Sequence, residues 1–528
     1  MTQQACVISR LGVEFPTKTL FHDLNFSLFA QQNSALIGRN GQGKSVMMQI
    51  LHQQPVHLPF AGQFFWQMPH AYLKQLQRLD VPTIAEALDV EQYHQTFKRI
   101  EQGTATFDDY ERAENFWHLP QLWLMQLQQA NLPTDLDFPV MLLSEGQKTK
   151  LALCRLFLLK DHYLLLDEPS NHLDSDSRSW LISCLNQHPS GALIISHDRH
   201  LLDKMQHIYT LNEHGLSHYS GNYTHYFEHS QLQTQALEHS VQQEKRELKQ
   251  LKNQQHQNLM KTQKRQRAGN KLRDSNSQAK ILLDFKKEQA GQNLSSLQQQ
   301  QSRQLKEAAK ALKEKKIQLE TVKAQQFNFF NNSIQSGEIL RINRLILSFG
   351  TTQKISFALN AGQKLLLQGE NGIGKSTLLK ILTYQVSAHN TKIIFSGNSF
   401  YLDQNFSFLN FELNAVDNLK RANPSISEVE WRNLLGQLRI RGEKSLIPLT
   451  RLSGGEQVKV ALLAISQSAQ KIDLLLLDEP ENHLDIESRD ILAHAISEYK
   501  GALILVSHDP SFIEKCRISD SFQLYRQD

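Results

Sequence analysis

The sequence predicts an α/β protein in which two copies of one module flank a long helical segment. Two glycine-rich octapeptides, 38–45 and 369–376, each follow an apolar strand-like run and precede a helical pattern. Between the copies, residues 229–336 contain no proline and only two glycines, and helix-forming Gln, Lys, Glu, Leu and Ala dominate. We therefore expect modules at 1–228 and 337–528, joined by an antiparallel pair of long helices with a basic turn between them.

The composition is typical of a folded protein of a reducing compartment. The 528 residues suffice for two or three domains, and 40% of them are hydrophobic. The four cysteines (6, 154, 184 and 516) are scattered, which argues against a disulfide framework and against a zinc site. The sequence has no run of about 18 apolar residues and does not begin like a signal peptide. We therefore expect a cytoplasmic protein with no membrane span.

The net charge of +4 is unevenly distributed along the chain. Residues 241–323 hold 20 Lys and Arg against 8 Asp and Glu, a balance of +12, so the remainder carries −8. A basic middle between mildly acidic modules predicts an anionic partner for the middle segment.

The first octapeptide is a G-x-x-x-x-G-K-S loop, the pattern that wraps phosphates. Its glycines allow the backbone to fold around a phosphate, and the N–H groups of the loop and of the following helix supply positive potential. Lys44 is expected to reach the β- and γ-phosphates, and Ser45 to ligate Mg²⁺. The predicted ATP-binding residues of this loop are Gly38, Arg39, Asn40, Gly41, Gln42, Gly43, Lys44 and Ser45.

Four further motifs follow the first loop in a fixed order. They are Gln75 after Tyr-Leu-Lys, the sequence LSEGQ at 143–147, an apolar run that ends in Asp167 and Glu168, and His197 after another apolar run. A buried strand that ends in Asp-Glu brings one carboxylate to Mg²⁺ and the next to an attacking water.

The same motifs recur in the second half of the chain, which predicts an internal repeat. The second copy has Gln404, LSGGE at 452–456, Asp478 with Glu479, and His508. Its predicted ATP-binding loop is Gly369, Glu370, Asn371, Gly372, Ile373, Gly374, Lys375, Ser376 and Thr377.

The spacing between motifs distinguishes the two copies. From Asp to His it is 30 residues in each, but from Gln to the signature Ser it is 69 in the first copy and 49 in the second. About 20 extra residues therefore lie within 91–117 of the first module. We expect a longer surface loop there, with a short protruding helix pair as the alternative.

Taken together, the ordered motifs resemble those of ATP-binding-cassette (ABC) ATPases. The strings DEPSNHLD at 167–174 and DEPENHLD at 478–485, and the Gly-Asn-Tyr at 221–223, are similar to the hallmarks of the ABC-F family. The resemblance covers nearly the whole chain. It implies two P-loop ABC ATPase domains that close on two ATP molecules within one monomer, each site being completed by the signature of the other module.

The resemblance implies roles for the matched residues, with ATP and Mg²⁺ as cofactors. The implied catalytic residues are Glu168, Glu479, His197, His508, Gln75 and Gln404, and the implied Mg²⁺ ligands are Ser45, Asp167, Ser376 and Asp478. The second signature (Ser453, Gly454 and Gly455) completes the first site, and Ser144 with Gly146 completes the second. Phe15 and Phe349 are candidates for stacking on adenine, with a core role as the alternative. Glu145 replaces a signature glycine and either weakens the second site or points away from it.

The linker carries the strongest basic cluster of the chain. Residues 261–287, where we expect the turn that forms the tip of the linker, hold nine basic and two acidic side chains. Leucines 305, 312 and 319 repeat every seven residues. Helices of about 30 to 40 residues extend about 45 to 60 Å. The candidate RNA-binding residues are Lys264, Arg265, Arg267, Lys271 and Arg273. The alternative is an ordinary solvated coiled coil.

Many ABC-F proteins bind the ribosome, so the resemblance implies an ATPase that acts on translation. Its linker is expected to reach toward the tRNA and the peptidyl-transferase region of rRNA, and protection from antibiotics is one expected outcome. The alternatives are a nucleic-acid-associated ATPase of DNA repair and, less favoured, the ATPase subunit of a transporter, where a long basic linker has no evident use.

Overall fold

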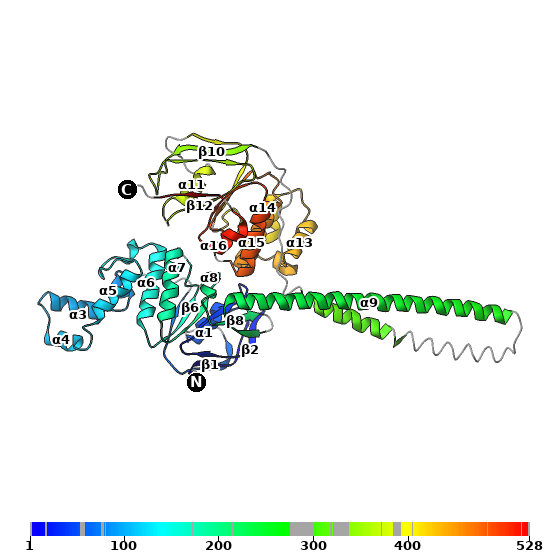
Figure 1. The fold of residues 1–528 in the computed structure, drawn as a ribbon, viewed down its shortest axis with the longest axis horizontal. Coiled ribbons are helices and arrows are strands. Elements are labelled where there is room, and N and C mark those ends of the chain that lie inside the picture. The colour runs from blue at the N-terminus through cyan, green and yellow to red at the C-terminus, as the bar shows by residue number, and fades with distance from the viewer. Residues whose placement is uncertain are drawn as a thin grey trace. The chain divides into compact units, whose positions relative to one another are not determined.

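The computed structural model describes most of both modules and part of the linker. The described residues are 3–15, 18–52, 59–74, 79, 81–171, 173–212, 215–274, 299–300, 302–316, 319, 337–370, 372–383, 392–403, 405–482, 484–518 and 520–525. The chain forms two compact units, one of Met1–Tyr223 with Gln325–Asp528, which holds both modules, and one of Thr224–Ala324 (Figure 1). The predicted α/β class, with two similar modules and a long helix between them, is confirmed.

The first module is built on a six-stranded sheet of order β5-β6-β7-β3-β8-β9. The first five strands run parallel, and β9 is antiparallel to β8. β3 and β6 are buried along their whole length, as expected of central parallel strands. The strands are β3 (Asn33–Ile37), β5 (His70–Leu73), β6 (Tyr163–Asp167), β7 (Ala192–Ile195), β8 (His207–Asn212) and β9 (Gly215–Ser220).

A second, antiparallel sheet of order β2-β1-β4 completes the strands of the first module. Its strands are β1 (Gln4–Phe15), β2 (Lys18–Phe29) and β4 (Phe60–Trp66). The apolar side chains of β1 and β2 share one core with α1, which follows the phosphate loop, so the sheet supports the nucleotide site from behind. The helices are α1 (Lys44–Leu51), α2 (Ile84–Ala87), α5 (Leu119–Gln129), α6 (Glu145–Leu158), α7 (Ser175–Gln187) and α8 (Arg199–Leu202), with a 3₁₀ turn at Val140–Leu142.

The second module repeats this plan without the extra residues. Its parallel sheet has the order β14-β15-β16-β12-β17, and its antiparallel sheet the order β11-β10-β13. The strands are β10 (Glu338–Leu345), β11 (Ile355–Asn360), β12 (Lys364–Gln368), β13 (Lys392–Phe395), β14 (Ser399–Leu402), β15 (Leu474–Asp478), β16 (Ala502–Val506) and β17 (Asp520–Gln523). The helices are α11 (Lys375–Leu382), α12 (Ala415–Ala422), α13 (Glu428–Gln437), α14 (Gly454–Ser466), α15 (Ile486–Glu498) and α16 (Pro510–Cys516), with 3₁₀ turns at Gly442–Ser445 and Leu449–Arg451.

The expectation of a loop over residues 91–117 is wrong, because this stretch contains two helices. They are α3 (Glu91–Glu101) and α4 (Phe107–Ala113). Phe97 and Ala113 bury their side chains against Trp123 of α5 and form a small core of their own. The physical reason is that α5 lies outside the insertion and offers it an apolar surface, which the spacing of the motifs alone does not reveal.

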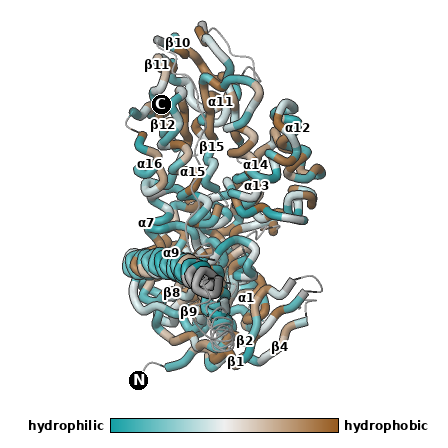
Figure 2. The backbone as a smooth tube through the Cα atoms, turned by 90° about the vertical axis from the view of Figure 1, so that its right-hand side faces the viewer, coloured by the Kyte–Doolittle hydropathy of each residue, from teal (hydrophilic) through white to brown (hydrophobic). Residues whose placement is uncertain are grey.

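The linker begins with α9 (Tyr223–Asp274), a single helix of 52 residues. A second helix at 302–316 packs beside it: Lys315 Nζ lies 2.8 Å from Glu244 Oε1, and Val241 and Leu312 are buried. Figure 2 shows the tube of α9 as mainly hydrophilic. No helix among the described residues is both long and apolar enough to cross a lipid bilayer.

The predicted basic turn is wrong for residues 261–274, because this stretch continues α9. All five candidate RNA-binding residues therefore lie on a helix, and the side chains of Lys264 and Arg267 are exposed. Because this stretch consists of good helix formers and has no proline, the helix and its backbone hydrogen bonds continue through it, so basic charge alone does not predict a turn. Residues 275–287 of the predicted tip lie outside the described residues.

The helix pair in the insertion depends on one acidic side chain, which yields a first prediction. Asp109 accepts a hydrogen bond from the Thr106 N–H at 2.9 Å and one from Arg99 Nε at 3.1 Å. Asp109→Ala should therefore uncap α4 and release it from α3, with amide exchange across 91–117 faster by roughly tenfold. Hydrogen-exchange mass spectrometry measures this directly. Asp108→Asn, at the exposed neighbour on the same helix, is the control and should leave the exchange rates unchanged.

Candidate nucleotide-binding sites

The first phosphate loop joins β3 to α1 and turns through backbone angles that favour glycine. Gly43 has φ 92° and precedes the helix. A Cβ at Gly38 would lie 2.5 Å from the Leu211 carbonyl oxygen, so the loop passes too close to β8 for any side chain. Lys44 is buried, and its ammonium donates to the carbonyl oxygens of Gly38 (2.6 Å) and Arg39 (3.1 Å). The ammonium thus lies on the side of the loop that a phosphate would approach.

The second loop has the same geometry. Lys375 Nζ donates to the carbonyl oxygens of Gly369 (2.7 Å) and Glu370 (3.1 Å), and to His508 Nε2 at 3.0 Å. Gly374 has φ 107° and precedes α11, so both loops begin their helices with a left-handed glycine. Asn371 of this loop lies outside the described residues.

The paired carboxylates stand where the sequence predicts, at the ends of two buried strands. Asp167 ends β6 and Asp478 ends β15. The next residues, Glu168 and Glu479, both have left-handed backbones, with φ of 54° and 46°. Such angles are uncommon outside glycine and cluster at functional sites. In each module a hydrogen bond from the Glu N–H to the neighbouring strand holds this turn, at 2.9 Å and 3.0 Å.

A histidine faces the glutamate in each module. His197 Nε2 lies 3.4 Å from Glu168 Oε1, and His508 Nε2 lies 3.5 Å from Glu479 Oε1. Burial lowers the pKa of His508 to about 4, helped by the positive charge of Lys375. Burial likewise lowers the pKa of His197. Both imidazoles are therefore neutral near pH 7, so each has an N–H to donate and a nitrogen to accept.

Burial also changes the pKa values of the carboxyl groups at both sites. It raises the pKa of Glu168, and the positive charge of Lys44 partly opposes that rise. Burial raises the pKa of Asp167 and of Asp478, while hydrogen bonds from Ser45 and Ser376 act in the opposite direction. A buried carboxyl with a raised pKa can take up a proton near neutral pH, which is what general-base chemistry requires.

The residues that the sequence predicts for Mg²⁺ fit such an ion. Asp167 Oδ1 and Asp478 Oδ1 are buried and have no hydrogen-bond partner among the described residues. Orphaned buried oxygens of this kind are costly unless a ligand satisfies them. The described residues contain no group of three or more His, Cys, Asp or Glu that could bind a metal. Mg²⁺ commonly takes one or two protein oxygens and completes its shell with phosphates and waters, so Ser45 with Asp167 and Ser376 with Asp478 would be sufficient protein ligands.

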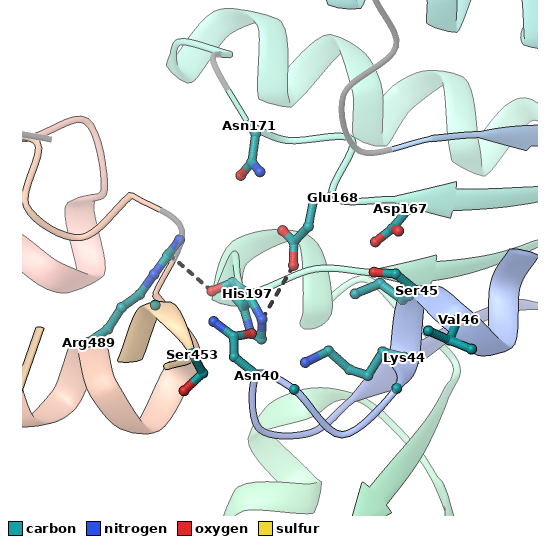
Figure 3. A pocket seen from close by; sticks show the side chains of 14 residues that line it. Asn40, Lys44, Ser45, Val46, Asp167, Glu168, Asn171, His197, Ser453 and Arg489 are labelled. Carbon is teal, nitrogen blue, oxygen red and sulfur yellow. Dashed lines mark hydrogen bonds and ion pairs between the residues drawn. The ribbon is translucent and has the colours of Figure 1, made fainter. Parts of the chain in front are cut away.

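The first nucleotide site contains residues of both modules. A cavity of about 350 Å³ is lined by the first phosphate loop, Glu168 and His197, and by Ser453, Gly454 and Arg489 of the second module (Figure 3). Ser453 caps α14, so the positive end of that helix faces this cavity. The structure thus brings the second signature to the first loop, as the resemblance implies.

At the second site, no described atom of the opposite signature comes as close to the loop glycine as at the first site. A Cβ built on Gly41 would meet Ser453 at 4.0 Å, but a Cβ on the matching Gly372 meets no described atom within 4 Å. Ser144 caps α6 as Ser453 caps α14. Glu145 points into solvent with 75% of its side chain exposed and pairs with Lys148 at 2.9 Å. Of the two alternatives for Glu145, the structure therefore favours a side chain directed away from the site.

Among the described residues, two ion pairs join the modules beside the first site. Arg39 Nε lies 2.6 Å from Glu487 Oε2, and the Asn40 N–H donates to Asp485 Oδ2 at 3.0 Å. Arg199 forms two bonds to Asp490, of 2.8 Å and 2.7 Å. By their offsets from the repeated motifs, Glu370 and Asp176 match Arg39 and Glu487. Pro510 and Ser179 match Arg199 and Asp490 in the same way. Neither combination provides opposite charges.

The remaining predicted residues have mixed outcomes. Phe349 is 72% exposed, which excludes the core role and leaves its ring available to a ligand. Phe15 lies on β1, opposite Lys18 of β2. Gly455 packs so tightly that a Cβ there would lie 2.4 Å from Ser488 Oγ, which explains the glycine. Gln75 and Gln404 lie outside the described residues.

Sequence reasoning missed Arg489, which lines the first site, and its counterpart Arg178. The available signal was positional: each arginine comes four residues after the last Asp of a DEP-x-NHLD string. It also missed the two tyrosines that bond the strand-end carboxylates, Tyr72 to Asp167 (3.4 Å) and Tyr401 to Asp478 (2.9 Å).

The fold and these sites define a tandem ATP-binding protein of the P-loop class, with two ABC modules in one chain. Residues 21–171 and 352–482 match the family model described as ABC transporter. The chain belongs to this family, and its two modules in one chain agree with the resemblance to ABC-F proteins found in the sequence.

Known proteins resemble the chain over nearly its whole length. The protein YdiF of Bacillus subtilis is 28% identical, across 96% of this chain and 78% of YdiF. The ribosome protection protein VmlR of the same organism is 27% identical, across 97% of this chain and 85% of VmlR. The archaeal ribosome recycling factor aABCE1, solved with the stalk protein aP1, shares the fold with a TM-score of 0.51 at 16% identity, across 96% and 86% of the two chains.

The second module contains a buried acid that gives a pH prediction. Glu481 is 3% exposed, accepts a hydrogen bond from Ser507 Oγ, and has its Oε2 buried without a partner among the described residues. Burial raises its pKa from 4.5 to about 7. Between these values the unfolded chain loses the proton and the folded chain keeps it, so stability falls as pH rises.

Glu481→Gln should remove this pH dependence. At pH 5 the variant should differ little from the wild type, because the folded carboxyl is protonated there. At pH 8 it should be more stable by up to about 3 kcal/mol. Thermal unfolding between pH 5 and pH 8 measures the difference. The exposed Glu443→Gln is the matched control, and a wild-type stability that does not fall relative to Glu481→Gln over this range contradicts the prediction.

Proposed function

We propose that the chain hydrolyses ATP at two composite sites and uses the resulting opening and closing to act on the translating ribosome. The observation that carries the proposal is the first site, where Lys44, Glu168 and His197 share one cavity with Ser453 of the other module. Residues from both modules in one nucleotide site make ATP a cross-link between the modules, and hydrolysis releases that link.

The chemistry follows from the protein groups. The loop N–H groups and Lys44 bind the β- and γ-phosphates, while the N-terminus of α14 approaches the γ-phosphate from the other module. Glu168 orients the attacking water and accepts its proton, and the neutral His197 donates a hydrogen bond to the γ-phosphate. A Mg²⁺ ion held by Ser45 and Asp167, or by Ser376 and Asp478, would neutralise developing phosphate charge. The second site uses Lys375, Glu479 and His508 in the same way.

The ribosome as partner is supported by two kinds of observation. VmlR is by its name a ribosome protection protein and aABCE1 a ribosome recycling factor, and both resemble this chain along nearly its full length. Independently, residues 261–274 of α9 hold six basic side chains and one acidic one. A helix of this charge suits the phosphates of rRNA and tRNA. We further propose that the protein acts as a cytoplasmic monomer and that protection from an antibiotic is one outcome of its binding.

Blocking hydrolysis tests the proposed function. With Glu168→Gln and Glu479→Gln together, ATP should close the modules without being cleaved, because the water-activating carboxylates are gone. The variant should co-sediment with ribosomes in ATP and arrest translation in a cell-free assay. The Lys44→Ala, Lys375→Ala protein is the control, since it lacks the phosphate-binding ammonium groups and should sediment free of ribosomes. Free migration of the Gln variant in ATP would rule out the ribosome as partner.

The basic part of α9 is tested separately by changing Lys264, Arg265, Arg267, Lys271 and Arg273 to Gln. Ribosome affinity should fall, and the slope of log K against log salt should become shallower by about 4 if all five side chains neutralise phosphates. A control with equal charge change replaces the exposed linker residues Lys245, Arg246, Lys249, Lys252 and Lys306 by Gln. Equal salt slopes for the two variants would show that residues 261–274 have no special role.

A further inference from the structure

Two arginines at matching positions connect the two catalytic centres. Arg178 lies on α7 and Arg489 on α15, each four residues after the aspartate that caps its helix. Both side chains are mostly buried, with 20% and 15% exposed. A mostly buried guanidinium needs bonded partners, because its charge is poorly solvated.

Arg489 binds a backbone carbonyl of the other module. Its Nη1 donates to the His197 carbonyl oxygen at 3.1 Å, the contact drawn in Figure 3. The same Nη1 donates to Asp509 Oδ2 of its own module at 3.1 Å, and Nε donates to the Leu484 carbonyl oxygen at 3.2 Å. Arg489 is thus anchored in the second module while it holds the backbone of a first-site residue.

Arg178 repeats this arrangement in the opposite direction. Its Nη1 donates to the His508 carbonyl oxygen at 3.3 Å, and its Nε lies 3.4 Å from Asp198 Oδ2 in its own module. These distances are longer than those of Arg489, and Nε makes no hydrogen bond among the described residues. The second-site histidine is therefore held less firmly than the first.

The four side chains and two carbonyls form a closed ring. Asp198 follows His197 and Asp509 follows His508, so the carboxylate that anchors each arginine is next to the carbonyl that the other arginine binds. The two aspartates also cap α8 and α16 through backbone N–H groups. A displacement of either histidine segment must therefore break a charge-assisted hydrogen bond to the opposite module.

We propose that Arg178 and Arg489 are positioning residues that hold the histidine of the opposite module at its glutamate only while the modules are closed. Each histidine lies within 3.5 Å of the glutamate of its own module. Opening the modules removes the arginine from the histidine carbonyl and frees the histidine segment. Closure therefore brings two parts of the opposite module to each site. One is the signature helix, which contacts the nucleotide, and the other is the arginine, which orients the histidine. This inference rests on the proposed ATP hydrolysis.

The test measures each site alone. In a Glu479→Gln background only the first site hydrolyses ATP, and in a Glu168→Gln background only the second does. Arg489→Met should lower kcat of the first site by about tenfold or more, the loss expected for a buried charge-assisted bond, with KM for ATP within about twofold. It should reduce second-site kcat less. Arg178→Met should show the reverse, with a smaller loss because its bonds are longer. Arg489→Lys should restore part of the first-site rate.

Every outcome decides the proposal. Equal losses at both sites would make the arginines a general contact between the modules and overturn the positioning role, as would a rise in KM alone or no change. Arg432→Met, at an arginine on the exposed face of α13, is the control and should leave both rates as they are. Thermal unfolding checks that each variant folds, and if Arg489→Met does not, the kcat and KM values of Arg489→Lys decide. A wild-type chain without ATP hydrolysis would instead refute the proposed function itself.

Discussion

The dependence of the first nucleotide site on both modules is the constraint around which the rest of the structure is arranged. The first phosphate loop binds the second module through Asn40 and Asp485, and Ser453 and Gly454 line the same cavity. Neither module by itself provides both the phosphate loop and the helix N-terminus that faces it. A ligand with several negative charges would be attracted to both of these positive ends and would therefore favour the closed arrangement.

The arrangement of the paired carboxylates and the histidine within each module is held by buried strands. Asp167 and Asp478 end strands that are buried along their whole length, and this burial raises the pKa of both carboxyls. Because of their left-handed backbones, Glu168 and Glu479 direct their own side chains away from the sheet and toward the histidine of the same module. Such a conformation costs on the order of 1 kcal/mol or more and persists only because the flanking strands over-determine it. The parallel sheet therefore does more than support the site, since it enforces the strained turn.

The two halves of the contact between the modules are not equivalent. Arg39 pairs with Glu487 and Arg199 with Asp490 beside the first site, whereas the repeat has acidic residues or uncharged ones at the matching positions. Ion pairs at partly buried positions hold better than exposed ones, because water screens them less. The bonds of Arg489 and Arg178 to the opposite module differ in the same sense, at 3.1 Å and 3.3 Å.

The sequence by itself determined the two-module architecture, the long helix between the modules, and the placement of loops, strand-end carboxylates and histidines. These features depend on local patterns, since glycine spacing, apolar runs and helix formers act over a few residues. Only the tertiary structure decided the helices of the insertion, because their core needs Trp123 from outside it, and the helical state of residues 261–274. It also decided that Arg489 belongs to the first site and that Glu145 points into solvent. The place of Arg489 joins residues hundreds of positions apart, and the direction of Glu145 depends on which neighbour offers an opposite charge.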